Sequence, residues 1–384
     1  MHFMGYKRPY GKVGIRNHVV VMAGVLCSDV AARRIADAVD NVVYLFNPQG
    51  CPDNRENTLE VMGGLLANPN VFSVLIVGNG CESVIEEDYR KAITSKAPGK
   101  WIEYISIQQI GGLGKTVIKG CEIVYDMLIE ASKCQREPCD ISELMLGLEC
   151  GGSDPTSGLS ANAALGLVSD RLVDLGGSTV ISETSEAIGA EHIMRARGAT
   201  PEIGEAIYQA ICHRAKVFEE AGMDIRDSNP SAGNIRSGLS TLEEKSLGCI
   251  NKSGSRPFMG CYRYGEMVTT KGANFMDTAA YDPISTAAEI AGGCQLVCFT
   301  SGMGTPMGNA IAPVIKITGN YEAAKRLEDI FDYDTSASLR GEKLLSEVAE
   351  ELFYLVVDVA NGRPTLAEMN KADVMLLDQY MMGC

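Results

Sequence analysis

One stretch decides the fold: residues Cys150–Asn162, with the sequence CGGSDPTSGLSAN. The apolar run Leu144–Leu148 precedes it and predicts a buried strand, and the pattern of Ala163–Leu175 after it predicts a helix. A strand that opens through glycines into a helix leaves backbone N–H groups unpaired, and such groups favour an anion. The alternative is a structural turn, in which Ser153 or Asp154 caps the helix and the thiol is a small buried group.

The rest of the chain alternates apolar runs with segments of helical spacing. In residues 1–140 the predicted strands are 18–26, 42–46, 71–77 and 101–107. Alternating strands and helices indicate a parallel sheet covered on both faces, so we predict a Rossmann-like α/β domain over residues 1–140. The polar segment 135–141, which contains a proline, is the predicted boundary. A second α/β domain follows over residues 141–384 and ends in a tail, from residue 321, that is predicted to be mostly helical.

Four of the 13 cysteines share a position that the others lack. Cys27, Cys51 and Cys81 each come just after a predicted strand, and Cys150 ends the strand before the glycine turn. Ligands of parallel sheets bind beyond the carboxyl ends of the strands, so these thiols are predicted to meet there. Thiolates are soft ligands that select iron–sulfur clusters, iron or zinc, and an open coordination position polarises a hydroxyl or carboxylate. We therefore predict these four cysteines as metal ligands, in a site suited to removing water from a hydroxy acid.

The composition limits the kinds of partner. A formal net charge of −15 argues against nucleic acid and anionic membranes. No segment approaches the roughly 18 continuous apolar residues that a membrane-spanning helix needs. The N-terminus lacks the apolar core of a signal peptide. These features predict a cytoplasmic protein, and they leave room for an anionic small substrate, because a local cationic site can lie in an acidic protein.

Several motifs are shared with a known family. They include Gly5-Tyr6-x-Arg8, Gly14-x-Arg16-Asn17, Gly80-Cys81-Glu82, Cys150-Gly151-Gly152-Ser153-Asp154 and Glu243-Glu244-Lys245. Through them, and over nearly the whole chain, the sequence resembles the altronate/galactarate dehydratase family. The resemblance implies removal of water from a sugar acid, such as altronate or galactarate, to give a 2-keto-3-deoxy acid. It also implies iron as the cofactor, either as Fe2+ or as an iron–sulfur cluster.

The resemblance leaves two alternatives open. A related branch of the family removes sulfite from 3-sulfolactate, which would use the same site. Asn47 stands where the family has a histidine, four residues before Cys51, which supports a non-catalytic binding subunit. Family members carry a small SAF-type domain or pair with it as a separate subunit. Because this chain begins at the Gly5-Tyr6 motif, we expect the large subunit of an oligomeric enzyme with a separate SAF-domain partner.

Side-chain chemistry and the resemblance together suggest roles for the remaining polar residues. Proton removal from the carbon next to the substrate carboxylate is assigned to one of Glu183, Lys245 and Lys271. Cations and amides suit a carboxylate, and the predicted substrate-binding residues are Arg16, Ser153, Asp154, Asn162 and Lys252.

Overall fold

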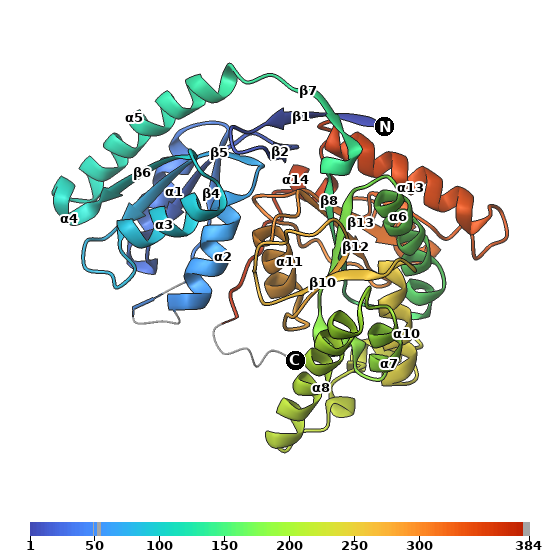
Figure 1. The fold of residues 1–384 in the computed structure, drawn as a ribbon. Helices are drawn as coiled ribbons and strands as arrows, with labels where there is room; N and C mark the ends of the chain where they lie inside the picture. The colour runs from blue at the N-terminus through green and yellow to red at the C-terminus, as the bar shows by residue number, and fades with distance from the viewer. Residues whose placement is uncertain (49, 52–54, 379–384) are drawn as a thin grey trace.

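The computed structural model describes residues 1–48, 50–51 and 55–378, which form two parallel β-sheets side by side (Figure 1). The first sheet has, in spatial order, the strands β4 (Val42–Leu45), β3 (His18–Ala23), β5 (Val71–Gly78) and β6 (Trp101–Ser106). Its helices are α1 (Asp29–Ala38), α2 (Arg55–Ala67), α3 (Glu86–Lys96), α4 (Ile107–Ile110) and α5 (Leu113–Ser132). Helices α1 and α5 pack on one face, and α2 and α3 on the other. The predicted parallel α/β arrangement is confirmed.

The second sheet is larger and also parallel throughout. Its strands, in spatial order, are β10 (Phe258–Tyr262), β11 (Gly272–Met276), β9 (Ser178–Ile181), β8 (Met145–Cys150), β12 (Leu296–Thr300), β13 (Val314–Thr318) and β14 (Tyr333–Asp334). Its longer helices are α6 (Asn162–Asp174), α8 (Pro201–Glu220), α10 (Leu242–Ile250), α11 (Asp282–Ala291) and α13 (Leu345–Ala360). The shorter ones are α7 (Glu191–Ala196), α9 (Ala232–Arg236), α12 (Tyr321–Arg326) and α14 (Leu366–Met369).

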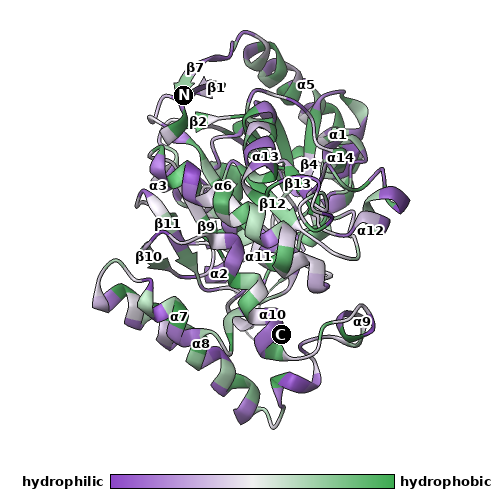
Figure 2. Ribbon diagram, turned by 90° about the vertical axis from the view of Figure 1, so that its right-hand side faces the viewer, coloured by the Kyte–Doolittle hydropathy of each residue, from purple (hydrophilic) through white to green (hydrophobic). Residues whose placement is uncertain are grey.

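Side chains along the central strands point alternately to the two faces of this sheet, and different helices cover each face. Leu146 and Leu148 of β8 pack with α6 and α13, whereas Val297 and Phe299 of β12 pack with α11. The strands in the middle of the sheet are mostly hydrophobic, whereas the outer helix α8 mixes hydrophobic and hydrophilic residues (Figure 2). A parallel sheet buried on both faces has this composition.

The segment 135–141, the predicted domain boundary, contains a short strand. Residues Glu137–Asp140 form β7, which pairs antiparallel with β1 (His2–Lys7), and β1 also pairs with β2 (Val13–Gly14). Pairing with the N-terminal strand therefore overrides the low strand propensity of this segment, which lies at the edge of the small sheet, where Pro138 is tolerated. The small sheet bridges the tops of the two larger ones (Figure 1).

The two large sheets also share a hydrophobic core, at the contact of α2 with α11. Gly64 lies so close to α11 that an added Cβ would sit 2.5 Å from the Ala291 carbonyl oxygen. The side-chain amide of Asn68 donates to the carbonyls of Ile290 (2.8 Å) and Cys294 (2.9 Å). Residues from both parts form one buried cluster, so this contact fixes how the two sheets are placed relative to each other.

The C-terminal tail is less helical than its sequence suggested. Up to residue 378 it contains α12, α13 and α14, with β14 and irregular segments between them, and α13 supplies most of its buried apolar face. The helical spacing of the intervening segments is overridden because β14 adds to the edge of the sheet beside β13. The part of the tail beyond residue 378 lies outside the described residues.

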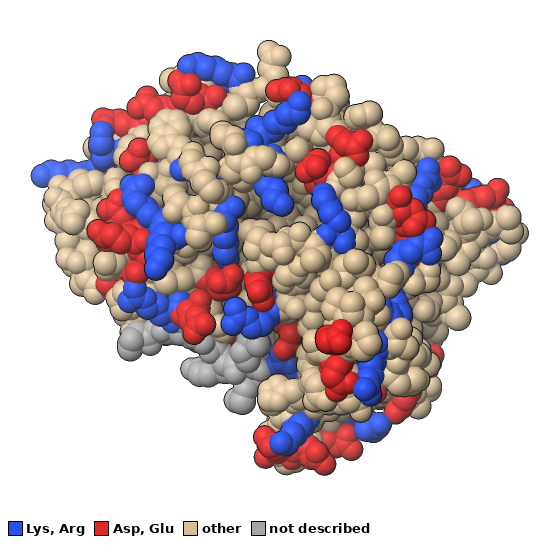
Figure 3. Space-filling view, viewed as in Figure 1, with Lys and Arg blue, Asp and Glu red and all other residues tan. Residues whose placement is uncertain are grey.

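The surface is charged with both signs. On the face seen in Figure 3, Lys and Arg side chains are interspersed with Asp and Glu. None of the described helices combines the length and the apolar character needed to cross a bilayer.

Candidate active site

Cys150 is the last residue of β8, at the carboxyl edge of the second sheet, and the glycine turn follows it. The residue is buried in the protein interior. The Cys150 backbone N–H donates to Glu183 Oε2 (3.0 Å), and Glu183 follows the neighbouring strand β9. Glu183 has a positive φ of 64°, which is uncommon for a residue with a side chain. Its backbone N–H donates to Thr278 Oγ1 (2.8 Å), which helps to hold this conformation. Unfavourable backbone geometry of this kind is concentrated at functional sites.

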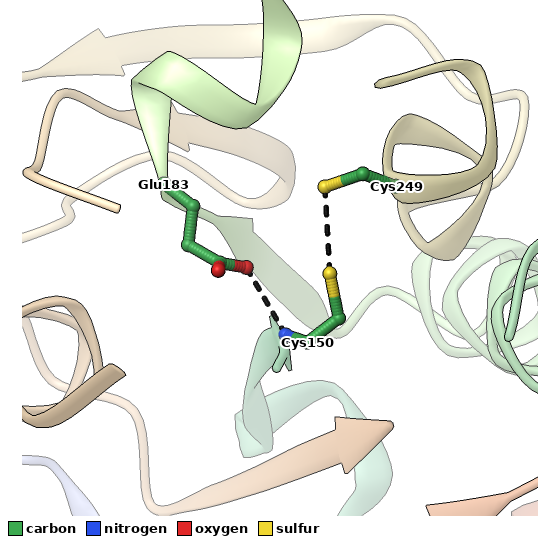
Figure 4. A group of neighbouring side chains, drawn as sticks. All are labelled: Cys150, Glu183 and Cys249. Atoms are coloured by element: carbon green, nitrogen blue, oxygen red, sulfur yellow. Dashed lines mark hydrogen bonds between the residues drawn. The ribbon is translucent and has the colours of Figure 1, made fainter. Parts of the chain in front are cut away.

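A buried ammonium joins Glu183 to two thiols. Lys252 Nζ donates to Glu183 Oε2 (2.6 Å), Cys150 Sγ (3.1 Å) and Cys249 Sγ (3.0 Å). The two sulfur atoms lie 3.5 Å apart, with the Cys150 thiol donating to Cys249 (Figure 4). The Lys252 side chain is 0% exposed and that of Glu183 is 2% exposed. We call these four residues the Lys252 cluster.

The Lys252 cluster balances its charges internally. Burial lowers the pKa of Lys252, but the acidic groups in contact with it, Glu183 among them, outweigh burial and hold the pKa well above its ordinary value. The hydrogen bond with Cys249, together with burial, raises the pKa of Cys150 well above that of a free thiol. Lys252 is therefore an ammonium and Cys150 a protonated thiol.

A cavity of about 190 Å³ opens beside the cluster. Its wall includes Cys150, the glycine turn and Ser153, with Lys245 and Asp282 contributing charged groups. We call it the Asp282 cavity. Lys245 Nζ donates to Glu186 Oε1 (2.9 Å) and Asn229 Oδ1 (2.6 Å). Burial lowers the pKa of Lys245, but Glu186 and the nearby thiols raise the pKa by more than burial lowers it. Lys245 is therefore also an ammonium.

Asp282 is a titratable group of this cavity whose pKa lies close to neutral pH. Burial, with the negative charge of Glu183 next in size, raises its pKa to about 7. Lys316 behind it acts in the opposite direction, and burial in turn lowers the pKa of Lys316 to about 7. The Asp282 carboxyl makes no side-chain hydrogen bond to another described residue, and it packs against Gly151, where an added Cβ would lie 2.3 Å from Oδ2. A carboxyl with this pKa in a cavity is suited to acid–base chemistry.

A second cavity, of about 360 Å³, lies on the other side of the glycine turn and shares Ser153 and Lys245 with the first. Asp154 and Asn162 line it. Asp154 Oδ1 accepts from the Ser157 backbone N–H (3.0 Å), so it caps the turn that leads into α6. Its own carboxylate therefore takes the position that an anion was predicted to occupy. Asn162 donates to the Gly248 carbonyl (2.9 Å) and ties α6 to α10.

Comparison with known proteins assigns both parts of the chain. Residues 141–382 match the family model described as D-galactarate/altronate dehydratase, C-terminal. Residues 5–132 match D-galactarate dehydratase/altronate hydrolase, second domain. The chain belongs to the D-galactarate/altronate dehydratase family.

Individual relatives in this family include enzymes with two kinds of leaving group. Altronate dehydratase of Escherichia coli is 32% identical over 378 residues, which cover 95% of this chain and 75% of that protein. Galactarate dehydratase (L-threo-forming) of the same species is 30% identical over 94% of this chain and 73% of that protein. The beta subunit of (2R)-sulfolactate sulfo-lyase from Chromohalobacter salexigens is 36% identical over 95% of this chain and 94% of that protein. As a member of this family, the chain is a lyase.

The structure brings most of the predicted polar residues of this lyase together, but not all of them. Glu183, Lys245 and Lys252 meet at the carboxyl edge of the second sheet. Lys271 instead precedes the first residue of β11, at the opposite edge, where it contacts the Ser142 carbonyl. Arg16 forms a buried ion pair with Glu368 (2.7 Å) and donates to three backbone carbonyls, so its guanidinium holds the fold together.

The predicted thiol ligands fall in two separate places. Cys27, Cys51 and Cys81 follow β3, β4 and β5, which are neighbours in the first sheet, and all three are exposed at its carboxyl edge. Within the described part of the chain their sulfur atoms do not all lie within 4.8 Å of one another. Cys150 belongs to the other sheet. The four predicted ligands therefore do not form one site in this structure.

Among the described residues, two groups have the spacing of metal ligands, and neither fits iron in its present arrangement. In one, the ligand atoms of Cys150, Glu183 and Cys249 lie within 4.8 Å of one another, but the Lys252 ammonium contacts all three. The other contains Glu149 and Asp282 with Glu183. There, burial and the neighbouring carboxylates raise the pKa of Glu149 well above its ordinary value, which disfavours the carboxylate form that a metal ion needs.

Iron stays a prediction, and its site can be tested by metal content. We expect Cys81→Ser to lose iron and Cys249→Ser to retain it, because the strand-edge thiols are exposed whereas the buried group already holds a cation. The measurement is iron and acid-labile sulfide in protein purified without oxygen. Loss of iron from Cys249→Ser, with full iron in Cys81→Ser, would place the metal in the Lys252 cluster instead.

Asn47, which we predicted to stand in place of a family histidine, is part of the buried structure. Its side-chain amide donates to the Ala23 carbonyl (3.0 Å) and to Tyr89 Oη (3.2 Å), and it is 0% exposed. Tyr89 in turn donates to the Gly24 carbonyl (2.8 Å). Asn47 therefore stabilises the chain just before Cys27.

Sequence reasoning missed Cys249, Glu186 and Asp282. A signal for the first was present, because Lys245, Cys249 and Lys252 follow the i, i+4, i+7 spacing of one helical face. Asp282 begins α11 ahead of Pro283, which made it look like an ordinary helix start. Its role depends on the approach of α11 to the glycine turn, which leaves no mark in the local sequence.

Proposed function

We propose that this lyase removes water from a sugar acid of the altronate or galactarate kind in the Asp282 cavity. The observation that carries the proposal is one cavity lined by a fixed ammonium, Lys245, and by a carboxyl with a pKa of about 7, Asp282. Elimination next to a carboxylate needs both groups. A cation must balance the charge that develops on the carboxylate, and a base must take the proton from the adjacent carbon.

In the proposed reaction, Asp282 takes the proton and Lys245 binds the substrate carboxylate. The electrons of the broken C–H bond form the double bond as the hydroxyl on the next carbon leaves. The leaving oxygen takes the proton from Asp282 and departs as water, so the residue returns to its starting state. The enol product then becomes the 2-keto-3-deoxy acid.

The Lys252 cluster shapes this cavity without entering the reaction. Glu183 accepts the Cys150 backbone N–H and the Lys252 ammonium, which fixes the glycine turn that forms the cavity wall. Its negative charge also contributes to the high pKa of Asp282. Glu183 and Lys252 are therefore proposed as positioning residues.

Removal of sulfite from sulfolactate is the second candidate. It is favoured by the sulfo-lyase relative, which this chain matches over 94% of that protein's length. The same base and cation would serve, but sulfite leaves as an anion, and the proton held by Asp282 then passes to solvent or to the departed sulfite. That relative is named as a beta subunit, which supports the proposal that this chain also acts with a second subunit.

Product analysis separates the candidates. The chain is incubated with altronate, galactarate or sulfolactate, with and without added ferrous iron, and both keto acid and sulfite are measured. Keto acid from a sugar acid without sulfite release supports the dehydratase, and sulfite release from sulfolactate supports the sulfo-lyase. Binding of an acid with no product under any condition would contradict both and favour a binding subunit.

A further inference from the structure

The two thiols of the Lys252 cluster have a geometry that catalysis by Asp282 and Lys245 does not use. Cys150 ends β8, and Cys249 lies on α10, 99 positions further along the chain. Their sulfur atoms face each other at 3.5 Å (Figure 4). A disulfide has an S–S length of about 2 Å, so a small approach of the two side chains would allow the bond to form.

The two sulfur atoms share a hydrogen-bond donor. Both accept a hydrogen bond from the Lys252 ammonium, and in addition the Cys150 thiol donates to Cys249. The thiolate is the form of a cysteine that attacks an oxidant, and the Lys252 ammonium lies within hydrogen-bond distance of both sulfur atoms.

Small molecules can approach both residues although each is only 4% exposed. Cys150 lines the Asp282 cavity, and Cys249 lines the cavity that contains Asn162. A peroxide is small enough to enter either, and the ammonium of Lys252 would stabilise the negative charge that moves to the peroxide oxygen.

We propose that Cys150 and Cys249 are a peroxide-oxidised pair, whose reversible disulfide switches off the reaction in the Asp282 cavity. The switching part of this proposal rests on the proposed function, but disulfide formation does not. The bond would remove both thiol contacts of Lys252 and pull on the glycine turn, which forms part of the cavity wall.

The chemistry balances with hydrogen peroxide as the oxidant. The Cys249 thiolate attacks one peroxide oxygen, the O–O bond breaks, and hydroxide leaves as Cys249 becomes a sulfenic acid. The Cys150 sulfur then attacks the Cys249 sulfur, and the sulfenic oxygen leaves as water with the Cys150 proton. Two electrons pass from the two thiols to one peroxide, and a dithiol such as dithiothreitol reverses the step.

The test uses the whole chain and two independent measurements. Protein is treated with one equivalent of hydrogen peroxide, remaining thiols are alkylated, and peptides are analysed by mass spectrometry without reduction. We expect a peptide pair crosslinked through Cys150 and Cys249, and a loss of turnover that follows the crosslinked fraction and is restored by dithiothreitol. Cys212→Ser, which removes a thiol of α8, should behave like the wild type, and Cys249→Ser should give no such crosslink.

The outcomes distinguish this inference from the proposed function. Recovery of Cys150 and Cys249 as separate alkylated thiols, while the exposed Cys81 is oxidised, would overturn the pair. A crosslink with unchanged turnover would overturn the switch. If neither sugar acids nor sulfolactate react before oxidation, the proposed function fails, and the mass measurement still decides the disulfide.

Discussion

Asp282→Asn is expected to reduce kcat about 10²–10⁴-fold, the usual contribution of a positioned general base. Asparagine has nearly the same size and keeps the packing against Gly151, but it cannot take a proton. The substrate carboxylate would still meet Lys245, so KM should change far less than kcat. The measurement is steady-state turnover of whichever acid proves to be the substrate.

The pH profile gives this prediction a second readout. The negative charges of Glu183 and Glu186 raise the pKa of Asp282, and the positive charge of Lys316 lowers it. Glu149 is a further carboxyl group close to Asp282. With the pKa at about 7, the base form is present above that pH and is lost as the pH falls through it. Wild-type kcat should therefore fall on the acid side of about pH 7, and the residual activity of Asp282→Asn should not follow that titration.

A matched control guards against a general effect of losing a carboxylate. Asp126→Asn removes an exposed carboxylate from α5, in the other part of the molecule, and should leave both kcat and the pH profile unchanged. An unchanged profile in Asp282→Asn would contradict the assignment of Asp282 as the base.

Lys252→Met is expected to destabilise the protein by about 3–5 kcal/mol, because it leaves the buried Glu183 carboxylate without its cation. Methionine keeps the length and apolar body of the side chain, so little packing is lost. The Cys249 sulfur would also lose its ammonium donor. The measurement is the free energy of unfolding from urea titration, followed by two spectroscopic probes.

Two further variants sharpen the test. Replacing Glu183 by glutamine in the Lys252→Met background removes the unpaired charge and should recover part of the loss, which is the sign of a direct coupling. Lys343→Met breaks an exposed ion pair with Glu351, whose side chains are 43% and 47% exposed, and should cost about 1 kcal/mol or less. Equal losses in Lys252→Met and Lys343→Met would contradict the buried-charge argument.

The local sequence predicted most of the helices and strands that have a regular hydrophobic periodicity or a run of β-branched residues. Strands β3, β5 and β6 and helix α6 lie close to their predicted positions. Strands β10 and β11 were missed because segments such as Gly272–Met276 (GANFM) have few β-branched residues and no alternation. They are strands because their neighbours in the sheet supply hydrogen bonds and burial on both faces.

The candidate site could also be predicted from the sequence only in part. The position of Cys150 and the glycine turn at a strand end could be predicted, because the chain direction of a parallel sheet follows from the alternation of strands and helices. The ion pair of Arg16 with Glu368 could not be predicted, because the partner lies 352 positions away along the chain. An arginine in an extended segment gives no sign of whether its partner is a ligand or another part of the chain.

The sequence by itself determined the α/β class, the parallel first sheet and the common edge that carries Cys27, Cys51 and Cys81. These follow from local periodicity and from the direction of consecutive strands. Only the tertiary structure decided that Lys252 lies between Cys150, Cys249 and Glu183, and that Asp282 reaches the same turn. Lys252 lies 102 positions from Cys150 and 69 from Glu183 along the chain, and Asp282 arrives through helix packing. These contacts therefore depend on the register of the second sheet and on the approach of α10 and α11 to it.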